Sequence, residues 1–168
     1  MISKKVEKEI NQQINAEMFS AYLYLSMSAY FESTNFPGFA NWMKIQAQEE
    51  LMHAMKLYAY LAERGGRITL TAITAPKTEW ENATEVFSEV LKHEKQITTL
   101  IDNLMNIAIA EKDHATATML QWFINEQVEE ESIAEKILND IKLIGTHGPS
   151  LLMLDRELGR RSFTGTQQ

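Results

Sequence analysis

Six polar residues of this chain form three pairs whose members are each 77 positions apart. The pairs are Glu17 with Glu94, Glu50 with Gln127, and His53 with Glu130. Oxygen ligands with a single imidazole suit iron or manganese better than a metal that prefers thiolates. The offset therefore predicts a site for two metal ions, built from two halves of the chain that repeat one another.

Each of the six residues lies on the inward stripe of a long helical pattern. The first stripe consists of Val6, Ile10, Ile14, Glu17, Ala21, Tyr24, Ser28 and Phe31. Such steps of three and four are typical of an amphipathic helix, and their average of about 3.5 favours left-handed bundle packing. We expect four such helices, over residues 3–34, 37–64, 83–111 and 114–144. The fold class is therefore all-α, an elongated four-helix bundle.

The connections predict the topology of this bundle. The breaks near Asn35 and Lys112 are short, so each pair of helices forms an antiparallel hairpin. Between the hairpins, residues 68–80 are rich in β-branched side chains but have no candidate partner strand. Extended, about 15 residues span roughly 50 Å, which is enough to run along the bundle and make the second and third helices parallel.

A short fifth helix is expected over residues 149–158, within one domain that spans residues 1–168. Its apolar positions are Leu151, Leu152, Leu154 and Leu158. Four helices already complete the bundle core, so this helix packs on one end of the bundle or against a neighbouring subunit.

Residues with known preferences mark the helix ends. Pro37 suits the first turn of the second helix, and Gly65 begins a pair of glycines that ends it. Asn82 and Asp113 can cap the third and fourth helices, and Gly145 can end the fourth.

The polar residues fall at one depth in both hairpins. Glu17 and Glu94 lie 18 positions before their turn, while Glu50 and Gln127 lie 15 after it. Buried carboxylates that lack partners would threaten the fold, and neither Lys nor Arg occupies an adjacent inward position. Two divalent cations would balance the four glutamates of this layer.

Composition excludes several classes of protein. The chain has 168 residues and a net charge of −7, and this charge argues against nucleic-acid or anionic-membrane partners. It has no cysteine, so neither disulfides nor thiolate metal sites can form. Residues 1–5 lead into an amphipathic helix without an apolar signal core, and no segment approaches a membrane span. We expect a soluble, cytoplasmic protein.

The resemblance to a known family rests on several stretches. Residues 50–53 follow the Glu-x-x-His plan of ferritin-like di-iron proteins, whereas residues 127–130 replace the second such motif with Gln-x-x-Glu. With this asymmetry and with residues 12–17, 21–25, 39–43 and 122–130, the chain resembles the non-haem ferritins of bacteria and archaea from the first helix to the fifth.

The resemblance implies an iron-storage protein with ferroxidase activity. Fe(II) and O2 would be the substrates, oxidation would take place at a di-iron centre within each subunit, and the ferric mineral would lie inside a homo-oligomeric shell of 24 subunits. The implied ligands are Glu17 and His53 for one iron, Glu94 and Glu130 for the other, Glu50 as the bridge, and Gln127 as a hydrogen-bonding residue near the first iron.

The same resemblance implies further roles, each with a plainer alternative. A third iron site would use Glu49, Glu126 and Glu129 and share Glu130, although these acids also fit a solvated face. Tyr24 would donate electrons or tune the oxidation, although it also fits a core tyrosine with a bonded hydroxyl.

Two positions depart from related proteins. Haem-binding bacterioferritins carry a methionine ligand directly after the bridging glutamate, where this chain has Leu51. Met52 points about 100° away on the helix, so we expect no haem. Many ferritins line a three-fold channel with carboxylates, but residues 116–121 contain none, which leaves the access route for iron open.

Three rival functions remain at this point. A rubrerythrin-type oxidase or peroxidase would normally carry a second His-bearing motif or a cysteine-rich iron domain, and both are absent from the sequence. A DNA-protecting mini-ferritin would place its ligands between subunits and lack the fifth helix. A metal-free structural bundle is the third rival, because one Glu-x-x-His alone is common on helix surfaces.

Overall fold

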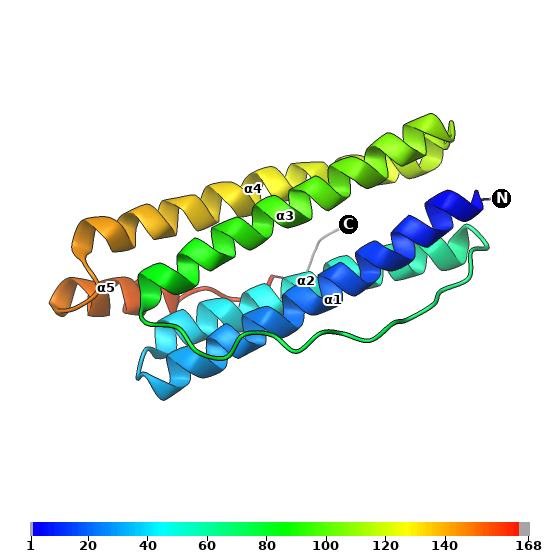
Figure 1. Cartoon of the computed structure of the whole chain (residues 1–168). Helices are drawn as coiled ribbons and strands as arrows, with labels where there is room; N and C mark the ends of the chain where they lie inside the picture. Colours follow the sequence, from blue (N-terminus) through cyan, green and yellow to red (C-terminus); the bar gives the residue numbers. More distant parts are fainter. Residues whose placement is uncertain (1, 165–168) are drawn as a thin grey trace.

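Five helices form the regular structure of residues 2–164, the part of the chain that this computed structural model describes (Figure 1). They are α1 (Lys4–Ser33), α2 (Pro37–Glu63), α3 (Ala83–Ala110), α4 (His114–Ile144) and α5 (Pro149–Leu158). No strand occurs within these residues, which confirms the all-α class. The expected range 1–168 also includes residues 1 and 165–168, which lie outside the described residues. Over residues 2–164, no helix is both long and apolar enough to cross a membrane.

The helix ends carry the expected caps. Pro37 opens α2, and the side chains of Asn82 and Asp113 each accept a hydrogen bond of 3.1 Å from the backbone N–H three residues later. Gly145 ends α4 with a φ of 82°, which favours glycine. Ser3 caps α1 in the same way as the other two, a feature that the sequence pattern did not indicate.

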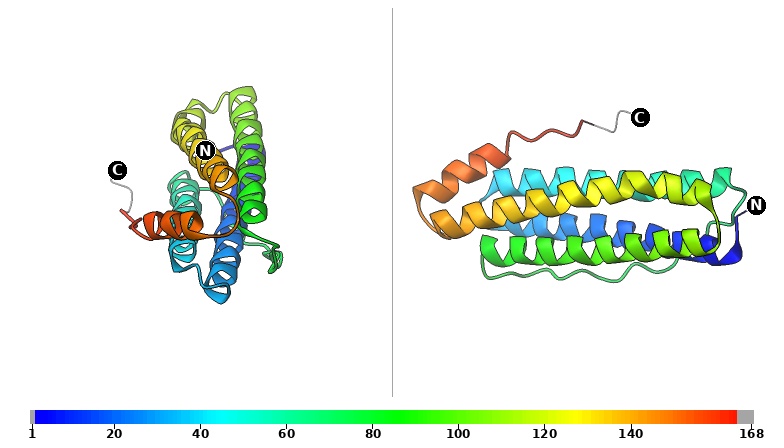
Figure 2. Two further views of the ribbon diagram at one scale, coloured as in Figure 1. Left: turned by 90° about the vertical axis from the view of Figure 1, so that its left-hand side faces the viewer. Right: turned by 90° about the horizontal axis from the view of Figure 1, so that it is seen from above.

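Two antiparallel hairpins lie side by side, and an extended crossover runs along α1 from the end of α2 to the start of α3 (Figures 1 and 2). Side chains of α1 hold it there. Asn11 donates to the Arg67 carbonyl at 2.9 Å and accepts from the Thr69 N–H at 2.7 Å, and Ser26 donates to the Lys77 carbonyl at 2.6 Å. The β-branched segment is therefore a crossover, and α2 and α3 run parallel as predicted.

The apolar core is divided into two clusters. One contains Phe31, Phe39 and Phe87 and lies towards α5, while the other contains Ile10 and Phe123 and lies towards the opposite end. Between these clusters lie buried polar residues of all four bundle helices, among them the six predicted for the metal site. The core therefore leaves a polar layer near the middle of the bundle.

Helix α5 packs across the first turn of α2, at one end of the bundle (Figure 2). The Asp155 carboxylate accepts a hydrogen bond of 2.9 Å from the Phe39 N–H, which has no partner within its own helix. Gly38 permits this approach, since a Cβ there would lie 1.6 Å from the Asp155 carbonyl oxygen. Of the four predicted apolar positions, Leu152 is exposed because it lies one step off the buried stripe.

Candidate metal centre

All six predicted residues are buried in the layer between the two apolar clusters. Their exposed fractions are 1% for Glu17, 2% for Glu50, 1% for His53, 1% for Glu94, 5% for Gln127 and 8% for Glu130. Four helices contribute to this layer, with α1 and α3 each supplying one residue and α2 and α4 each supplying two. The structure thus brings together side chains that are far apart in the sequence.

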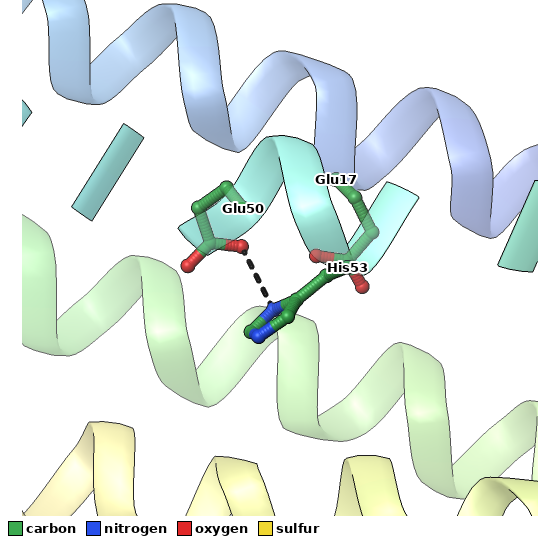
Figure 3. A group of neighbouring side chains, drawn as sticks. All are labelled: Glu17, Glu50 and His53. Carbon is green, nitrogen blue, oxygen red and sulfur yellow. Dashed lines mark ion pairs between the residues drawn. The ribbon is translucent and has the colours of Figure 1, made fainter. Parts of the chain in front are cut away.

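Three of these side chains converge closely, as Figure 3 shows. Glu17 of α1 and Glu50 and His53 of α2 each offer a ligand atom, and these atoms lie within 4.8 Å of one another. The His53 Nδ1 is 3.5 Å from the Glu50 Oε2. Among the described residues this is the one group of three acidic or histidine side chains that meets so closely. One cation placed between them could contact all three.

Hydrogen bonds within the described residues satisfy the Glu17 carboxylate only in part. Its Oε1 accepts a hydrogen bond of 2.7 Å from the Gln13 Nε2, whereas its Oε2 is buried and has no hydrogen-bond partner. Leaving such an atom unpaired costs about 1–3 kcal/mol. A cation held by Glu17, Glu50 and His53 would satisfy this oxygen, and the mixture of carboxylate and imidazole ligands suits iron.

Burial makes the carboxyls of this layer hard to ionise. Burial and the neighbouring Glu50 raise the pKa of Glu17 well above its usual range. Burial, Glu94 and Glu130 do the same to the pKa of Glu50. Burial raises the pKa of Glu94 and, together with Glu94, raises the pKa of Glu130 to about 8. Without a cation the layer therefore holds protons, and a bound cation has to displace them.

Glu94 and Glu130 lie outside the close group and already have hydrogen-bond partners. The Tyr24 hydroxyl donates a short hydrogen bond to the Glu94 Oε1. The Gln46 Nε2 donates to the Glu130 Oε2 at 2.7 Å. These two carboxylates interact electrostatically with Glu50, but the three do not form a second group as compact as the first.

Gln127 lies beside Glu94 in this layer. Its Nε2 donates at 3.2 Å both to the Glu94 carbonyl and to the Glu94 Oε2, and at 3.3 Å to the Thr98 hydroxyl. The reason is the hairpin packing, since α4 pairs with α3 and not with α1. Gln127 therefore supports Glu94. A hydrogen bond of Gln127 near the first iron stays a prediction.

Two glutamines of the layer were given no role by the sequence. Gln13 donates to Glu17, and the Gln46 Nε2 donates to the Glu50 Oε1 at 3.3 Å as well as to Glu130. Each amide lies four positions before the carboxylate of its own helix, on an inward face. That spacing of a polar residue from a predicted ligand is the signal that could have identified them.

Aromatic side chains pack against His53, and Tyr24 is buried beside the same layer. The His53 ring meets Trp122 edge to face at a centroid distance of 5.3 Å, and meets Phe123 at 5.9 Å. Tyr24 is fully buried, and its burial and the nearby Glu94 raise the pKa of its hydroxyl well above the usual range. Tyr24 is therefore a neutral hydrogen-bond donor to the layer.

The acids predicted for a third site lie beside this layer. Glu49 and Glu126 are partly buried and Glu129 is exposed. The Glu126 Oε2 is 4.0 Å from the His53 Nε2. An arginine that the helical pattern did not reveal, Arg161, forms an ion pair with Glu49. It comes from the segment after α5, so no inward stripe could have shown it.

The chain is similar to known proteins over nearly its whole length. Residues 7–144 match the family described as "Ferritin-like domain". The bacterial non-heme ferritin of Bacteroides fragilis is 47% identical over 161 residues, which cover 96% of this chain and 100% of that protein. The bacterial non-heme ferritin of Staphylococcus aureus is 39% identical, with 97% and 98% covered.

Solved structures give the same result. A closed form of the Archaeoglobus fulgidus ferritin, engineered by mutagenesis, has a TM-score of 0.96 and 49% identity, covering 98% of this chain and 100% of that one. The open pore ferritin of the same archaeon has a TM-score of 0.95 and 49% identity, with 96% and 100% covered.

Proposed function

This chain belongs to the ferritin family, and we propose on that basis that it stores iron, oxidising Fe(II) with O2 and holding the Fe(III) as a mineral inside an oligomeric shell. The observation that carries the proposal is the buried group of Glu17, Glu50 and His53 with its unpaired carboxylate oxygen. A metal-free structural bundle gains nothing from such a group, because a buried carboxylate without a partner destabilises the fold.

The proposed site takes two Fe(II) ions per subunit. The ligands would be Glu17 and His53 for the first, Glu94 and Glu130 for the second, and Glu50 between them. Gln127 would act through Glu94, since its amide donates to that carboxylate. Gln46 would orient Glu50 and Glu130 relative to each other, because one amide nitrogen donates to both.

The chain's own groups explain how Fe(II) would bind. The protonated carboxyls of the layer lose their protons as the cations arrive, which keeps the buried charge near zero. Each Fe(II) then gives up one electron, so one pair supplies the two electrons that, with two protons, reduce O2 to H2O2. Two pairs supply the four electrons that, with four protons, reduce O2 to water. The aromatic enclosure of His53 excludes bulk water, and the resulting Fe(III) hydrolyses and leaves for the interior of the shell.

We propose that Tyr24 influences the oxidation. Its hydroxyl donates to the Glu94 Oε1, so it can stabilise that carboxylate or pass an electron to an iron that Glu94 holds. Both the stabilisation of Glu94 and the electron transfer are proposed roles of Tyr24. The third cation position would use Glu49, Glu126 and Glu129 together with Glu130.

Assembly is also part of the proposal. A mineral needs an enclosure, and we propose a shell of 24 copies of a single-domain chain of residues 1–168 in the cytoplasm. Exposed apolar side chains support self-association, among them Tyr22 and Leu25 on α1, Leu143 on α4 and Met153 on α5. Size-exclusion chromatography with light scattering tests this step, and a stable dimer would contradict it.

The activity is tested by adding Fe(II) to the protein in air and following the near-ultraviolet absorbance of Fe(III). The wild-type protein should oxidise Fe(II) well above the buffer rate. The double variant Glu50→Ala/His53→Ala should lose this excess, because it removes two of the three converging ligands. A matched control, Glu135→Ala/His114→Ala, changes the same residue types at exposed positions and should keep the wild-type rate. Equal rates in both double variants would reject the site.

A further inference from the structure

The segment that follows α5 continues along the bundle in the direction of α5 (Figure 2). It carries Arg161 to Gln46, whose amide meets the polar layer. Its position is fixed by a series of contacts at the start of α2. Asp155 caps Phe39, and the Asn41 amide donates to the Arg161 carbonyl at 2.9 Å. Gly159 lies close to Gly38, where a Cβ on Gly159 would be 3.2 Å from the Gly38 Cα. The docking of α5 therefore determines where Arg161 lies.

The guanidinium of Arg161 makes three contacts with α2. One nitrogen donates to the Gln46 Oε1 at 2.9 Å. The other donates a short hydrogen bond to the Glu49 Oε2 and forms an ion pair with it. The guanidinium also lies over the Trp42 ring, 4.6 Å from its centroid. Such a planar fork, held at both nitrogens and stacked on a ring, is a defined position for a charge.

Through Gln46 the same charge acts on the layer itself. An arginine only donates hydrogen bonds, so it fixes the Gln46 oxygen towards itself. The Gln46 amide nitrogen must then face inwards, where it donates to Glu50 and Glu130. Arg161 thus neutralises Glu49 and determines which end of Gln46 meets the proposed ligands.

We propose that Arg161 is a tethered cation at the third position, and that a metal ion binds to the acids around Glu49 only by displacing it. The inference rests on the proposed function and deepens it. If Glu49 bound a metal ion while it kept its ion pair with Arg161, the metal ion and the guanidinium would lie a few ångströms apart and repel each other. Displacement frees Glu49 and loosens the segment after α5, so the third position fills after the first two and more weakly.

The test uses Zn2+, which does not change its oxidation state, and measures binding to the metal-free assembled protein by calorimetry. Arg161→Gln removes the charge but keeps an amide that can meet Glu49. Its third binding step should be about tenfold tighter than in the wild type, since one repulsive charge is gone. Arg161→Lys keeps the charge and should remain closer to the wild type. Arg160→Gln removes the neighbouring exposed charge and should change nothing.

A second readout follows the segment itself. Hydrogen exchange measured by mass spectrometry should show faster exchange in residues 156–164 of the wild type when the third equivalent of Zn2+ binds, but not with the first two. In the Arg161→Gln variant these amides should already exchange faster without metal. A purely structural arginine would not make the exchange depend on the third equivalent.

Each of the following results would overturn the proposal. They are a third step of equal affinity in the wild type and in Arg161→Gln, the same change in Arg160→Gln, and exchange in residues 156–164 that does not respond to the third equivalent. Absence of a third step from both proteins would overturn it as well. The first two steps in the wild type report on the proposed function. If the wild type lacks them, the di-iron site is rejected, whereas a failed third step with the first two present rejects only the role of Arg161.

Discussion

Replacing Glu17 by glutamine should stabilise the metal-free protein while weakening its response to metal. The Glu17 Oε2 is buried without a hydrogen-bond partner, and the neighbouring Glu50 raises the cost of its ionisation. A neutral amide of the same size keeps the hydrogen bond from Gln13 if its oxygen takes the Oε1 position. Its nitrogen can then donate towards Glu50, whose carboxylate lies in the same close group.

The gain can be estimated from the atom that is relieved. Leaving a buried oxygen unpaired costs about 1–3 kcal/mol, so the free energy of unfolding should rise by about that amount. For a chain of this size, 1 kcal/mol shifts the melting temperature by about 2–4 °C. The metal-free Glu17→Gln variant should therefore melt about 2–12 °C higher than the wild type.

Scanning calorimetry at pH 8 measures both parts of the prediction. With chelator present, the variant should melt above the wild type. With Zn2+ at about a hundred times its dissociation constant, the wild type should gain about 2.7 kcal/mol per bound site, whereas the variant has lost a charged ligand and should gain less. Glu135→Gln, an exposed change of the same kind on α4, should alter neither value by more than about 0.5 kcal/mol.

The opposite pattern would refute this reasoning. If Glu17→Gln lowers the melting temperature of the metal-free protein and still shows the full gain with Zn2+, then the Glu17 carboxylate is satisfied by protein groups and is not a metal ligand.

Further predictions concern the polar layer and the docking of α5. The pKa of Glu130 is raised to about 8, so between about pH 4.5 and 8 this group is protonated in the folded chain and ionised in the unfolded chain. The free energy of unfolding of the metal-free protein should therefore fall as the pH rises through this window, by up to about 1.4 kcal/mol per pH unit. Denaturation at several pH values measures this fall, and a flat profile would contradict it. Because the carboxyls of the layer are protonated without metal, Zn2+ binding at pH 7 should release protons. The calorimetric heat of binding should then depend on the ionisation enthalpy of the buffer. A heat that is independent of the buffer would show that the layer is already ionised. Tyr24→Phe removes the hydroxyl that donates to Glu94, so it should lower the free energy of unfolding by about 1 kcal/mol and slow Fe(II) oxidation. The number of Zn2+ ions bound should not change, whereas a lost binding step would make Tyr24 a ligand. Gly38→Ala should lower the melting temperature, because the new methyl group cannot fit against the Asp155 backbone. In this variant the amides of residues 149–164 should exchange hydrogen faster. Unchanged exchange would show that α5 docks by other contacts.

Periodicity explains why so much of the fold could be predicted. The helices of a four-helix bundle can be read from the local spacing of apolar residues. The inward stripes of α1 to α4 also contain Glu17, Glu50, Glu94 and Glu130, so these residues point inwards whatever the exact packing of the helices. The all-α class, the hairpins and the long crossover are confirmed by the five helices and by the structural neighbours. The constant offset works for the same reason, since equal spacing from each turn gives equal depth.

What the sequence could not give depends on contacts between helices. Gln127 shares a stripe with Glu130, but only the packing of α4 against α3 decides that it meets Glu94. Arg161 lies outside every periodic segment, and only the docking of α5 carries it to Glu49. The two halves of the layer also differ in compactness, which equal spacing along the chain does not predict.

Anomalous scattering from crystals soaked with Fe(II) without oxygen tests the central claim most directly. Data collected on either side of the iron absorption edge locate each iron atom. The account predicts two peaks in the buried layer of every subunit, one in contact with Glu17, Glu50 and His53 and the other with Glu94 and Glu130. A layer without anomalous density, with iron found only at surface acids, would contradict it.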